Sequence, residues 1–373
     1  MEFYLPDRLI TGENCVAANS GRFRTFGRRC LIVTGGASAK RSGALADVSA
    51  ALDGQGIAYD VFDRIAPNPA VSACQAGGRA ASAFGADFVV GIGGGSPLDA
   101  AKAVAAFAAN PEMSEAEFYS AQWPHPPLPI VLVGTTVGTG SEVTSVSVLT
   151  DASGKKHSIH DDRLYAALAL GDARYTRSLP RAATLSTGID ALAHCVESAL
   201  SRKADSLSRL FAAQGLRLAV PVLTAAAAGD GALTGAEREA LYEASILGGL
   251  AINRTGTVFP HNVGYYLTER YGIPHGFASA YLMPALLDHI DRCAPEAARD
   301  FFAAAGITED GLRALLQSVL PPLAATAAEE EIAAALPRWR ENGTVKNTLG
   351  TVTEAEIAAA LRGLLLRAEE KRT

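Results

Sequence analysis

The 373-residue sequence has few cysteines, few charged residues and no recognisable targeting segment. Its five cysteines are widely spaced and odd in number, and no Cys-x-x-Cys pair occurs, which argues against a disulfide framework and fits reduced thiols. The first seven residues lack the basic-then-apolar layout of a secretory leader, and no segment approaches the roughly 20 apolar residues that span a bilayer. We therefore expect a cytoplasmic protein without a membrane partner.

Charge of either sign is also scarce, because only 19% of the residues are Asp, Glu, Lys or Arg and their formal net charge is −6. Lys and Arg are scattered along the chain, so nucleic acid is not the expected partner. The 49% of apolar residues excludes a disordered chain, and the length suggests about two domains. A small molecule is the partner that this composition favours.

The first half of the sequence alternates short apolar runs with alanine-rich helical stretches. The runs at residues 30–34, 59–62, 87–92 and 129–133 are typical of strands buried on both faces. Strands that alternate with helices form a parallel sheet covered by helices on both sides. We predict an α/β domain with a doubly wound, Rossmann-like parallel sheet over residues 1–180.

The second half is rich in Ala, Leu, Glu and Arg and contains no convincing strand. Apolar residues recur at intervals near 3.6 residues in stretches such as 206–219 and 235–250. The segment 352–372 has the pattern of a terminal amphipathic helix. We predict an all-α domain over residues 181–373.

A run of three glycines at residues 93–95 follows a predicted strand and leads into a predicted helix. Glycine lets the backbone approach a phosphate closely, Ser96 can donate a hydrogen bond, and the helix N-terminus adds partial positive charge. The run matches neither Gly-x-Gly-x-x-Gly nor a Walker motif. It predicts a phosphate site. The alternative is that the glycines only form a tight turn that other residues could not adopt.

A second loop, residues 134–144, also follows a predicted strand and is dense in glycines and hydroxyls. Such a loop offers small donors to an extended polar ligand and leaves room for its rings. The alternative for any single hydroxyl is local turn capping. The candidate binding residues in this loop are Thr135, Thr136, Ser141 and Thr144.

The segment after the first predicted strand occupies the place where an adenosine ribose lies in such sheets. An acidic residue there would bind a 2′-hydroxyl and repel a 2′-phosphate, but the sequence has Gly35, with Ser38, Lys40 and Arg41 nearby. This favours NADPH, or the use of both NADPH and NADH. The alternative is that Lys40 and Arg41 are solvated charges at a helix start.

Three of the seven histidines combine with one aspartate as a candidate metal site in the second half. Asp190 and His194 are four residues apart and therefore share a helix face, which taken alone also fits a core hydrogen bond. His261 and His275 follow fourteen residues apart. Together the four supply a set of nitrogen and oxygen ligands for Fe²⁺ or Zn²⁺.

In the order and spacing of the segments 93–99, 135–144, 188–197 and 261–276, the sequence resembles the iron-containing (group III) alcohol dehydrogenase family over nearly its whole length. The resemblance implies a dehydroquinate synthase-like fold with an N-terminal dinucleotide-binding domain, a helical C-terminal domain, a metal in the cleft between them, and a homodimer.

The resemblance also implies roles for individual residues. The metal ligands match Asp190, His194, His261 and His275, and Asp99 lies at a motif position near the cofactor. The positions that match cofactor contacts are Gly94, Gly95, Ser96, Thr135, Thr136, Ser141 and Lys156.

One position departs from the family pattern. Many members carry a second histidine four residues after the position of His261, near the nicotinamide, where this sequence has Tyr265. We therefore expect proton handling through Tyr265 or through a chain of water molecules. The gapless spacing to His275 still makes His261 the ligand.

The activity that the resemblance implies is oxidoreduction between a small aldehyde and its primary alcohol with NAD(P)H. Arg254, seven residues before His261, is a candidate for binding a carboxylate, phosphate or phosphonate, assisted by His157 and His160. The alternatives are an ion pair between domains for Arg254 and solvated loop positions for the two histidines.

The pattern over residues 253–276 is similar to that of reductases of phosphonate-bearing aldehydes such as phosphonoacetaldehyde or phosphonoformaldehyde. Three other functions stay open at this point. They are a neutral short-chain alcohol dehydrogenase, a dehydroquinate synthase-like lyase that recycles NAD, and a metal-dependent hydrolase.

Overall fold

The computed structural model describes residues 3–229 and 231–366. The chain folds into two compact units. The α/β unit comprises Glu2–Thr184 and Thr234–Tyr242, and the helical unit comprises Leu185–Leu233 and Glu243–Thr373.

The α/β unit contains a six-stranded sheet in the order β1-β8-β5-β4-β2-β3, and every neighbouring pair is parallel. This confirms the predicted parallel sheet and adds two strands, β1 and β8, that were not predicted. The strands are β1 (Leu9–Thr11), β2 (Arg29–Thr34), β3 (Ala58–Phe62), β4 (Phe88–Gly93), β5 (Ile130–Gly134) and β8 (Leu168–Gly171).

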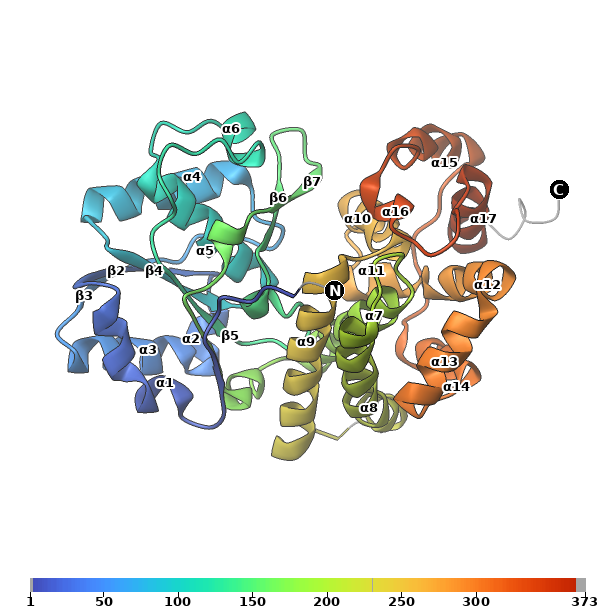
Figure 1. Cartoon of the computed structure of the whole chain (residues 1–373), viewed down its shortest axis with the longest axis horizontal. Coiled ribbons are helices and arrows are strands. Elements are labelled where there is room, and N and C mark those ends of the chain that lie inside the picture. Colours follow the sequence, from blue (N-terminus) through green and yellow to red (C-terminus); the bar gives the residue numbers. More distant parts are fainter. Residues whose placement is uncertain (1–2, 230, 367–373) are drawn as a thin grey trace. The chain divides into compact units, whose positions relative to one another are not determined.

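Helices cover both faces of this sheet. Successive side chains of β2 point in opposite directions, so they pack against different helices. Leu31 and Val33 join one buried cluster with residues of α4 and α5, whereas Cys30 and Ile32 join another with residues of α1 and α3. Figure 1 shows these two pairs of helices on opposite sides of the sheet. The helices of the unit are α1 (Cys15–Ala18), α2 (Ser38–Ser42), α3 (Ala44–Gly54), α4 (Val71–Phe84), α5 (Gly95–Ala109) and α6 (Glu115–Tyr119).

An antiparallel hairpin follows the second predicted cofactor loop and was not predicted. Its strands are β6 (Val146–Thr150) and β7 (Lys156–His160), and Thr150 pairs with Lys156.

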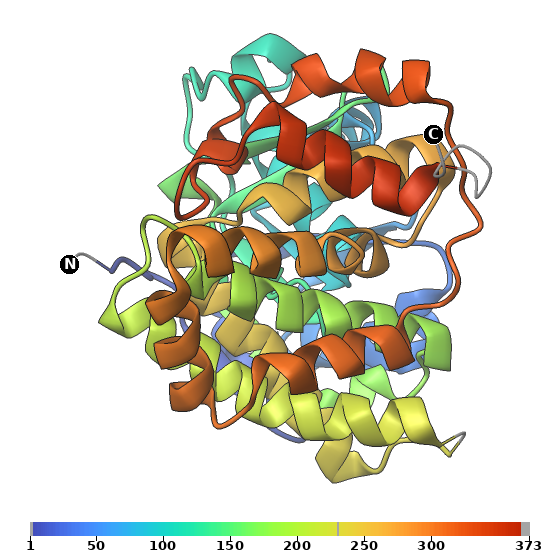
Figure 2. The ribbon, with the colours of Figure 1, turned by 90° about the vertical axis from the view of Figure 1, so that its right-hand side faces the viewer.

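The second half is helical, as predicted, and Figure 2 faces its helices. Between residues 172 and 366, apart from residue 230, the structure has no strand beyond an isolated bridge of Ser201 with Thr348. The longer helices are α7 (Arg181–Ala199), α8 (Ser206–Ala228), α9 (Gly235–Thr255), α10 (Phe259–Tyr271), α12 (Met283–Cys293), α13 (Pro295–Ala305), α14 (Glu309–Val319) and α17 (Glu354–Leu365). The shorter ones are α11 (His275–Ala280), α15 (Glu329–Ala335) and α16 (Gly343–Lys346).

Two predictions about this half are confirmed only in part or are wrong. The terminal helix predicted over 352–372 is found as α17, and residues 367–373 lie outside the described part. The expectation that no segment is long and apolar enough to span a bilayer is wrong, because α8 meets that test by length and composition. A core helix of a soluble protein meets the same test, and Leu216 and Leu223 of α8 are fully buried.

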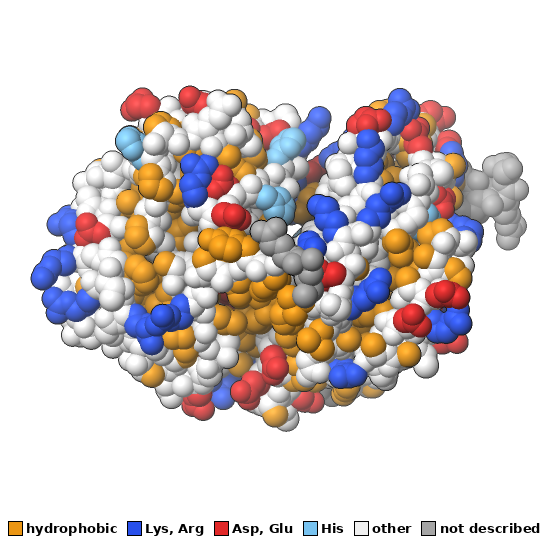
Figure 3. Space-filling view, in the orientation of Figure 1, with side chains coloured by type: hydrophobic (Ala, Val, Ile, Leu, Met, Phe, Trp, Pro, Cys, Tyr) orange, Lys and Arg blue, Asp and Glu red, His pale blue; other side chains and the backbone are white. Residues whose placement is uncertain are grey.

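The distribution of surface charge and the state of the cysteines agree with the expectations of scattered charges and reduced thiols. Basic and acidic side chains are interspersed on the face shown in Figure 3. All five cysteines are free, and four of them are buried.

Candidate active site

The two predicted cofactor loops begin side by side at the carboxyl ends of adjacent strands. Gly93 of β4 is in register with Gly134 of β5, and the backbone N–H of Thr135 donates to the carbonyl of Gly93 over 2.9 Å. The chain order reverses next to these strands, because β2 has β3 on one side and β4 on the other. Ligands of open α/β sheets bind at such a reversal, outside the carboxyl ends of the strands.

Glycine is required where the two loops meet. A Cβ atom on Gly94 would lie 2.7 Å from Cγ2 of Thr136, and one on Gly95 would lie 2.6 Å from Cγ2 of Thr139. Gly95 is also the first residue of α5, so the N-terminus of a fifteen-residue helix faces this region. Ser96 Oγ accepts from the backbone N–H of Asn68 over 3.2 Å. The first loop therefore retains the features that suit a phosphate.

The second loop is held by a buried lysine that sequence reasoning missed. Lys102 on α5 is fully buried, and its Nζ donates to the carbonyl of Ser141 and to Ser141 Oγ at 2.9 Å and to the carbonyl of Val146 at 2.7 Å. It also lies 3.4 Å from Thr144 Oγ1. The spacing of Asp99 and Lys102, three residues apart in a predicted helix, could have indicated that the two side chains are neighbours.

Asp99 completes this anchor. Its carboxylate accepts from Ser141 Oγ at 2.6 Å and from the backbone N–H of Val148 at 3.0 Å. Burial raises the pKa of Asp99 and lowers that of Lys102, and each charge opposes the effect on the other. The positive charge of Lys156, at the start of β7, also acts on Asp99. Asp99 and Ser141 thus shape the loop from within the α/β unit.

The predicted ribose segment lies at the same reversal, after β2. Ser38 Oγ donates to the carbonyl of Gly35 over 3.4 Å, and Lys40 Nζ lies 3.3 Å from Oδ2 of Asp63. A Cβ atom on Gly35 would lie 2.9 Å from the carbonyl oxygen of Ile65, so the close approach of that backbone also requires glycine. Lys40 is 60% exposed and can turn toward a ligand.

The four predicted metal ligands lie together in the helical unit. The Nε2 atom of His261 lies 3.1 Å from Nε2 of His194 and 3.1 Å from Nε2 of His275. Asp190 Oδ1 lies 3.7 Å from His261 Nε2 and 3.8 Å from His275 Nε2. Asp190 and His194 come from α7, His261 from α10, and His275 from the first turn of α11. Three of the four residues are buried, and His275 is partly exposed.

Small residues let these helices approach one another. A Cβ atom on Gly276 would lie 1.9 Å from the carbonyl oxygen of Ser186 on α7, and one on Gly264 of α10 would lie 2.9 Å from the backbone nitrogen of Ser279. The glycine after His275 is therefore required for packing and brings this histidine to the site.

The donor set fits a divalent cation. Three imidazole nitrogens and one carboxylate oxygen form a typical set for Fe²⁺ or Zn²⁺. One in-plane lone pair on His261 Nε2 cannot point at two other ring nitrogens, whereas all three lone pairs can point at one ion. Among the described residues, Asp190, His261 and His275 form a group whose ligand atoms all lie within 4.8 Å of one another.

Glu197 also belongs to this site and was not predicted. It follows His194 by three residues on α7, and its Oε1 lies 2.9 Å from His261 Nδ1. The spacing of Asp190, His194 and Glu197 places all three on one helix face, and this spacing could have indicated that Glu197 lies at the site.

Tyr265 lies against the ligands, as its position four residues after His261 suggests. Its ring stacks on that of His275 with centroids 5.3 Å apart and meets the ring of His261 edge-on at 6.2 Å.

The predicted anion-binding residue Arg254 donates from Nε to Oδ2 of Asp205 at 2.9 Å. Both residues belong to the helical unit, so the expected ion pair between domains is not the one that forms.

His157 and His160 both lie on β7 in the α/β unit. His157 Nε2 pairs with Asp151 Oδ2 at 2.9 Å, and its side chain is half exposed, as the solvated alternative described.

Comparison with known proteins decides the family. Residues 6–173 match the model of the iron-containing alcohol dehydrogenases, and residues 184–338 match the model of the C-terminal part of that family. The chain is an iron-containing alcohol dehydrogenase by family. The sulfoacetaldehyde reductase of Bilophila wadsworthia is 34% identical over 75% of this chain and 72% of its own. The lactaldehyde reductase of Escherichia coli is 28% identical over 81% and 78%.

Solved structures agree with this family assignment. An iron-containing alcohol dehydrogenase from Thermotoga maritima superposes with a TM-score of 0.89 at 34% identity and covers 98% of this chain and 99% of its own. The sulfoacetaldehyde reductase of Bifidobacterium kashiwanohense, solved with NAD⁺, gives a TM-score of 0.87 at 27% identity over 97% and 98%. The protein is therefore an oxidoreductase of the iron-containing type, and the lyase and hydrolase alternatives are set aside.

Proposed function

We propose that this iron-containing alcohol dehydrogenase reduces a small anionic aldehyde to its primary alcohol with NADPH or NADH. The observation that carries the proposal is the convergence of His194, His261 and His275 Nε2 atoms beside Asp190 Oδ1. These four residues would hold Fe²⁺, with Zn²⁺ as the other candidate.

A divalent ion held there would supply Lewis-acid polarisation of the aldehyde oxygen, and the nicotinamide would supply the hydride. The residues of the chain bind and orient. The two glycine-rich loops receive the pyrophosphate and nicotinamide portions of the cofactor, and we expect contacts at Gly94, Gly95, Ser96, Thr135 and Thr136. We assign proton handling to Tyr265, whose ring lies on His275, or to water next to it.

The charge of the substrate is the finer part of the proposal. A phosphonate is a tetrahedral anion, and the relative from Bilophila wadsworthia is named for an aldehyde that carries another such anion, a sulfonate. Arg254 is the candidate for recognising this group, in exchange for part of its contact with Asp205. We therefore favour an aldehyde such as phosphonoacetaldehyde or phosphonoformaldehyde over a neutral short-chain one.

Cofactor choice, assembly and compartment complete the proposal. Gly35 leaves no acid to repel a 2′-phosphate, and Ser38 and Lys40 are the candidates for binding it. We expect a homodimer in the cytoplasm.

The test is oxidation of NADPH and of NADH, followed by absorbance, with Fe²⁺-loaded protein and matched neutral, carboxylate-bearing, sulfonate-bearing and phosphonate-bearing aldehydes. The proposal predicts turnover with the highest kcat/KM on the phosphonate aldehydes. A preference for neutral aldehydes would overturn the anionic part, and no oxidation with any pair would overturn the reductase.

A further inference from the structure

The ligand histidine His261 has its second ring nitrogen against a buried carboxylate. Glu197 on α7 is fully buried, and its Oε1 lies 2.9 Å from Nδ1 of His261. Its other oxygen, Oε2, accepts from the backbone N–H of Val258 over 2.8 Å. Val258 precedes α10, the helix that carries His261. One side chain therefore holds both the start of this helix and the ring of the ligand three residues later.

We propose that Glu197 is a positioning residue that keeps His261 as the Nδ1–H tautomer. With the hydrogen on Nδ1, the lone pair of Nε2 faces His194, His275 and Asp190, where a metal ion would lie. This inference rests on the proposed function, because it assigns a role in binding the ion.

The two contacts of Glu197 explain why a carboxylate is required. The N–H of Val258 is a backbone donor, so the oxygen that meets it must accept. With His261 as the Nδ1–H tautomer, the other oxygen must accept as well. Only a carboxylate presents two acceptors on one planar group.

Glutamine has almost the same shape but one acceptor and one donor on that group. If its oxygen accepts from Val258, its NH₂ faces His261 and favours the other tautomer, with hydrogen on Nε2. If the group is reversed, two donors meet at Val258. Glu197→Gln therefore changes the favoured tautomer of His261 and keeps the size of the side chain at this position.

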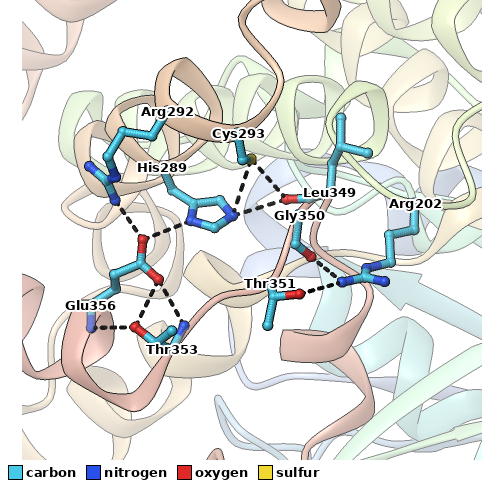
Figure 4. A network of polar contacts seen from close by, with 9 residues as sticks. All are labelled: Arg202, His289, Arg292, Cys293, Leu349, Gly350, Thr351, Thr353 and Glu356. Atoms are coloured by element: carbon cyan, nitrogen blue, oxygen red, sulfur yellow. Dashed lines mark hydrogen bonds and ion pairs between the residues drawn. The ribbon is translucent and has the colours of Figure 1, made fainter.

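The helical unit contains a matched pair that serves as control. His289 on α12 has its Nδ1 2.9 Å from Oε1 of Glu356, the same carboxylate-to-imidazole contact at the same distance. Figure 4 shows this contact. The Nε2 atom of His289 lies 3.0 Å from the carbonyl oxygen of Leu349 and 3.6 Å from Sγ of Cys293, so that nitrogen contacts neither the candidate metal ligands nor Glu197. Glu356→Gln changes an equivalent pair outside the metal centre.

The experiment measures Zn²⁺ affinity by competition with a chelator for wild type, E197Q and E356Q. Selective ¹⁵N labelling of the histidines identifies the tautomer of His261 in the metal-free protein. We expect E197Q to bind Zn²⁺ about 10- to 100-fold more weakly and to move the hydrogen of His261 to Nε2. We expect E356Q to retain the wild-type affinity.

Equal Zn²⁺ affinity of E197Q and wild type would overturn the inference. So would wild-type His261 with its hydrogen on Nε2, a measurement that does not depend on the folding of any variant. Absence of Zn²⁺ binding in wild type, with His261 in the Nδ1–H form, would instead overturn the proposed function and leave the positioning role supported.

Discussion

The Nε2 atoms of His194 and His261 lie 3.1 Å apart, although 67 positions separate the two residues in the chain. Their helices, α7 and α10, are drawn together by Glu197, which follows His194 on α7 and contacts both His261 and Val258. Two imidazole nitrogens without a hydrogen at this distance repel each other unless a cation or a proton lies between them. The fold therefore maintains an arrangement that a divalent ion stabilises.

Removing the carboxylate from this group is expected to remove the metal. Asp190→Ala leaves three imidazoles and no carboxylate among the candidate ligands, so bound metal and aldehyde turnover should fall together, with kcat reduced by roughly a hundredfold or more. Metal content is measured by mass spectrometry of dialysed protein. Asp288→Ala, an exposed partner of Arg313 in the same unit, should leave both unchanged. Full turnover and full metal content in Asp190→Ala would contradict the ligand assignment.

The buried Lys102 should control the nucleotide loop without touching the metal. Lys102→Met removes the cation 3.8 Å from the largely buried Asp99 carboxylate, which costs about 3–5 kcal/mol. We expect lower thermal stability and weaker NADH binding, measured by calorimetry and by fluorescence titration, with unchanged Zn²⁺ affinity. The double variant Asp99→Asn with Lys102→Met should recover part of the stability. Single and double variants of equal stability would show that the pair is not coupled.

The Glu356 pair predicts an acid-dependent loss of stability. Burial opposes ionisation of Glu356, but hydrogen bonds from His289, Thr353 and Arg292 outweigh it and lower its pKa to about 2, from an ordinary value of 4.5. A carboxyl with a lowered pKa stabilises the fold above its unfolded pKa and loses this effect as the pH falls toward its folded pKa.

The difference in unfolding temperature between wild type and Glu356→Gln should therefore be largest above pH 4.5 and shrink between pH 4.5 and 2. Thermal unfolding followed by circular dichroism across this range provides the measurement. A difference that is constant across the range would refute the linkage.

Lys40 is expected to distinguish the two nicotinamide cofactors. Its side chain is 60% exposed and pairs with Asp63 at 3.3 Å, so it can exchange this partner for a 2′-phosphate. Lys40→Ala should raise KM for NADPH about tenfold, by the loss of one charge-assisted contact, and leave KM for NADH unchanged. Arg41→Ala, the next residue, is the matched comparison. An equal rise for both cofactors would place Lys40 outside the 2′-phosphate site.

Arg254 gives the corresponding test for the substrate. Arg254→Ala should raise KM for a phosphonate aldehyde about 10- to 100-fold and leave a neutral aldehyde of the same length unaffected. Asp205→Asn retains an oxygen for the start of α8 but removes the charge that holds Arg254, and should lower KM for the phosphonate aldehyde only. Equal losses on both aldehydes in Arg254→Ala would show a structural role alone.

The sequence predicted those features that depend on local pattern. Apolar strands next to alanine-rich helices identified the parallel sheet, and the spacing of Asp190 and His194 identified the face of α7 that meets His261. Family motifs then joined these residues to His261 and His275.

Features that depend on long-range packing had no such signal. Lys102 was one charged residue in an apolar helix, and only the folded chain places it under Ser141. Arg254 could be placed near His261 by spacing, but its ion pair with Asp205 depends on how α8 and α9 lie together. The return of Thr234–Tyr242 to the α/β unit follows likewise from tertiary packing.

The most direct measurement is the dependence of aldehyde reduction on Fe²⁺. Protein stripped with a chelator under anaerobic conditions would be titrated with Fe²⁺, and NADPH or NADH oxidation would be followed with the best aldehyde of the panel. We expect negligible oxidation without metal and a plateau at one Fe²⁺ per chain, since Asp190, His261 and His275 form one group of ligand atoms and His194 lies against His261. Full oxidation in stripped protein, or activity that rises without saturating at one equivalent, would contradict it.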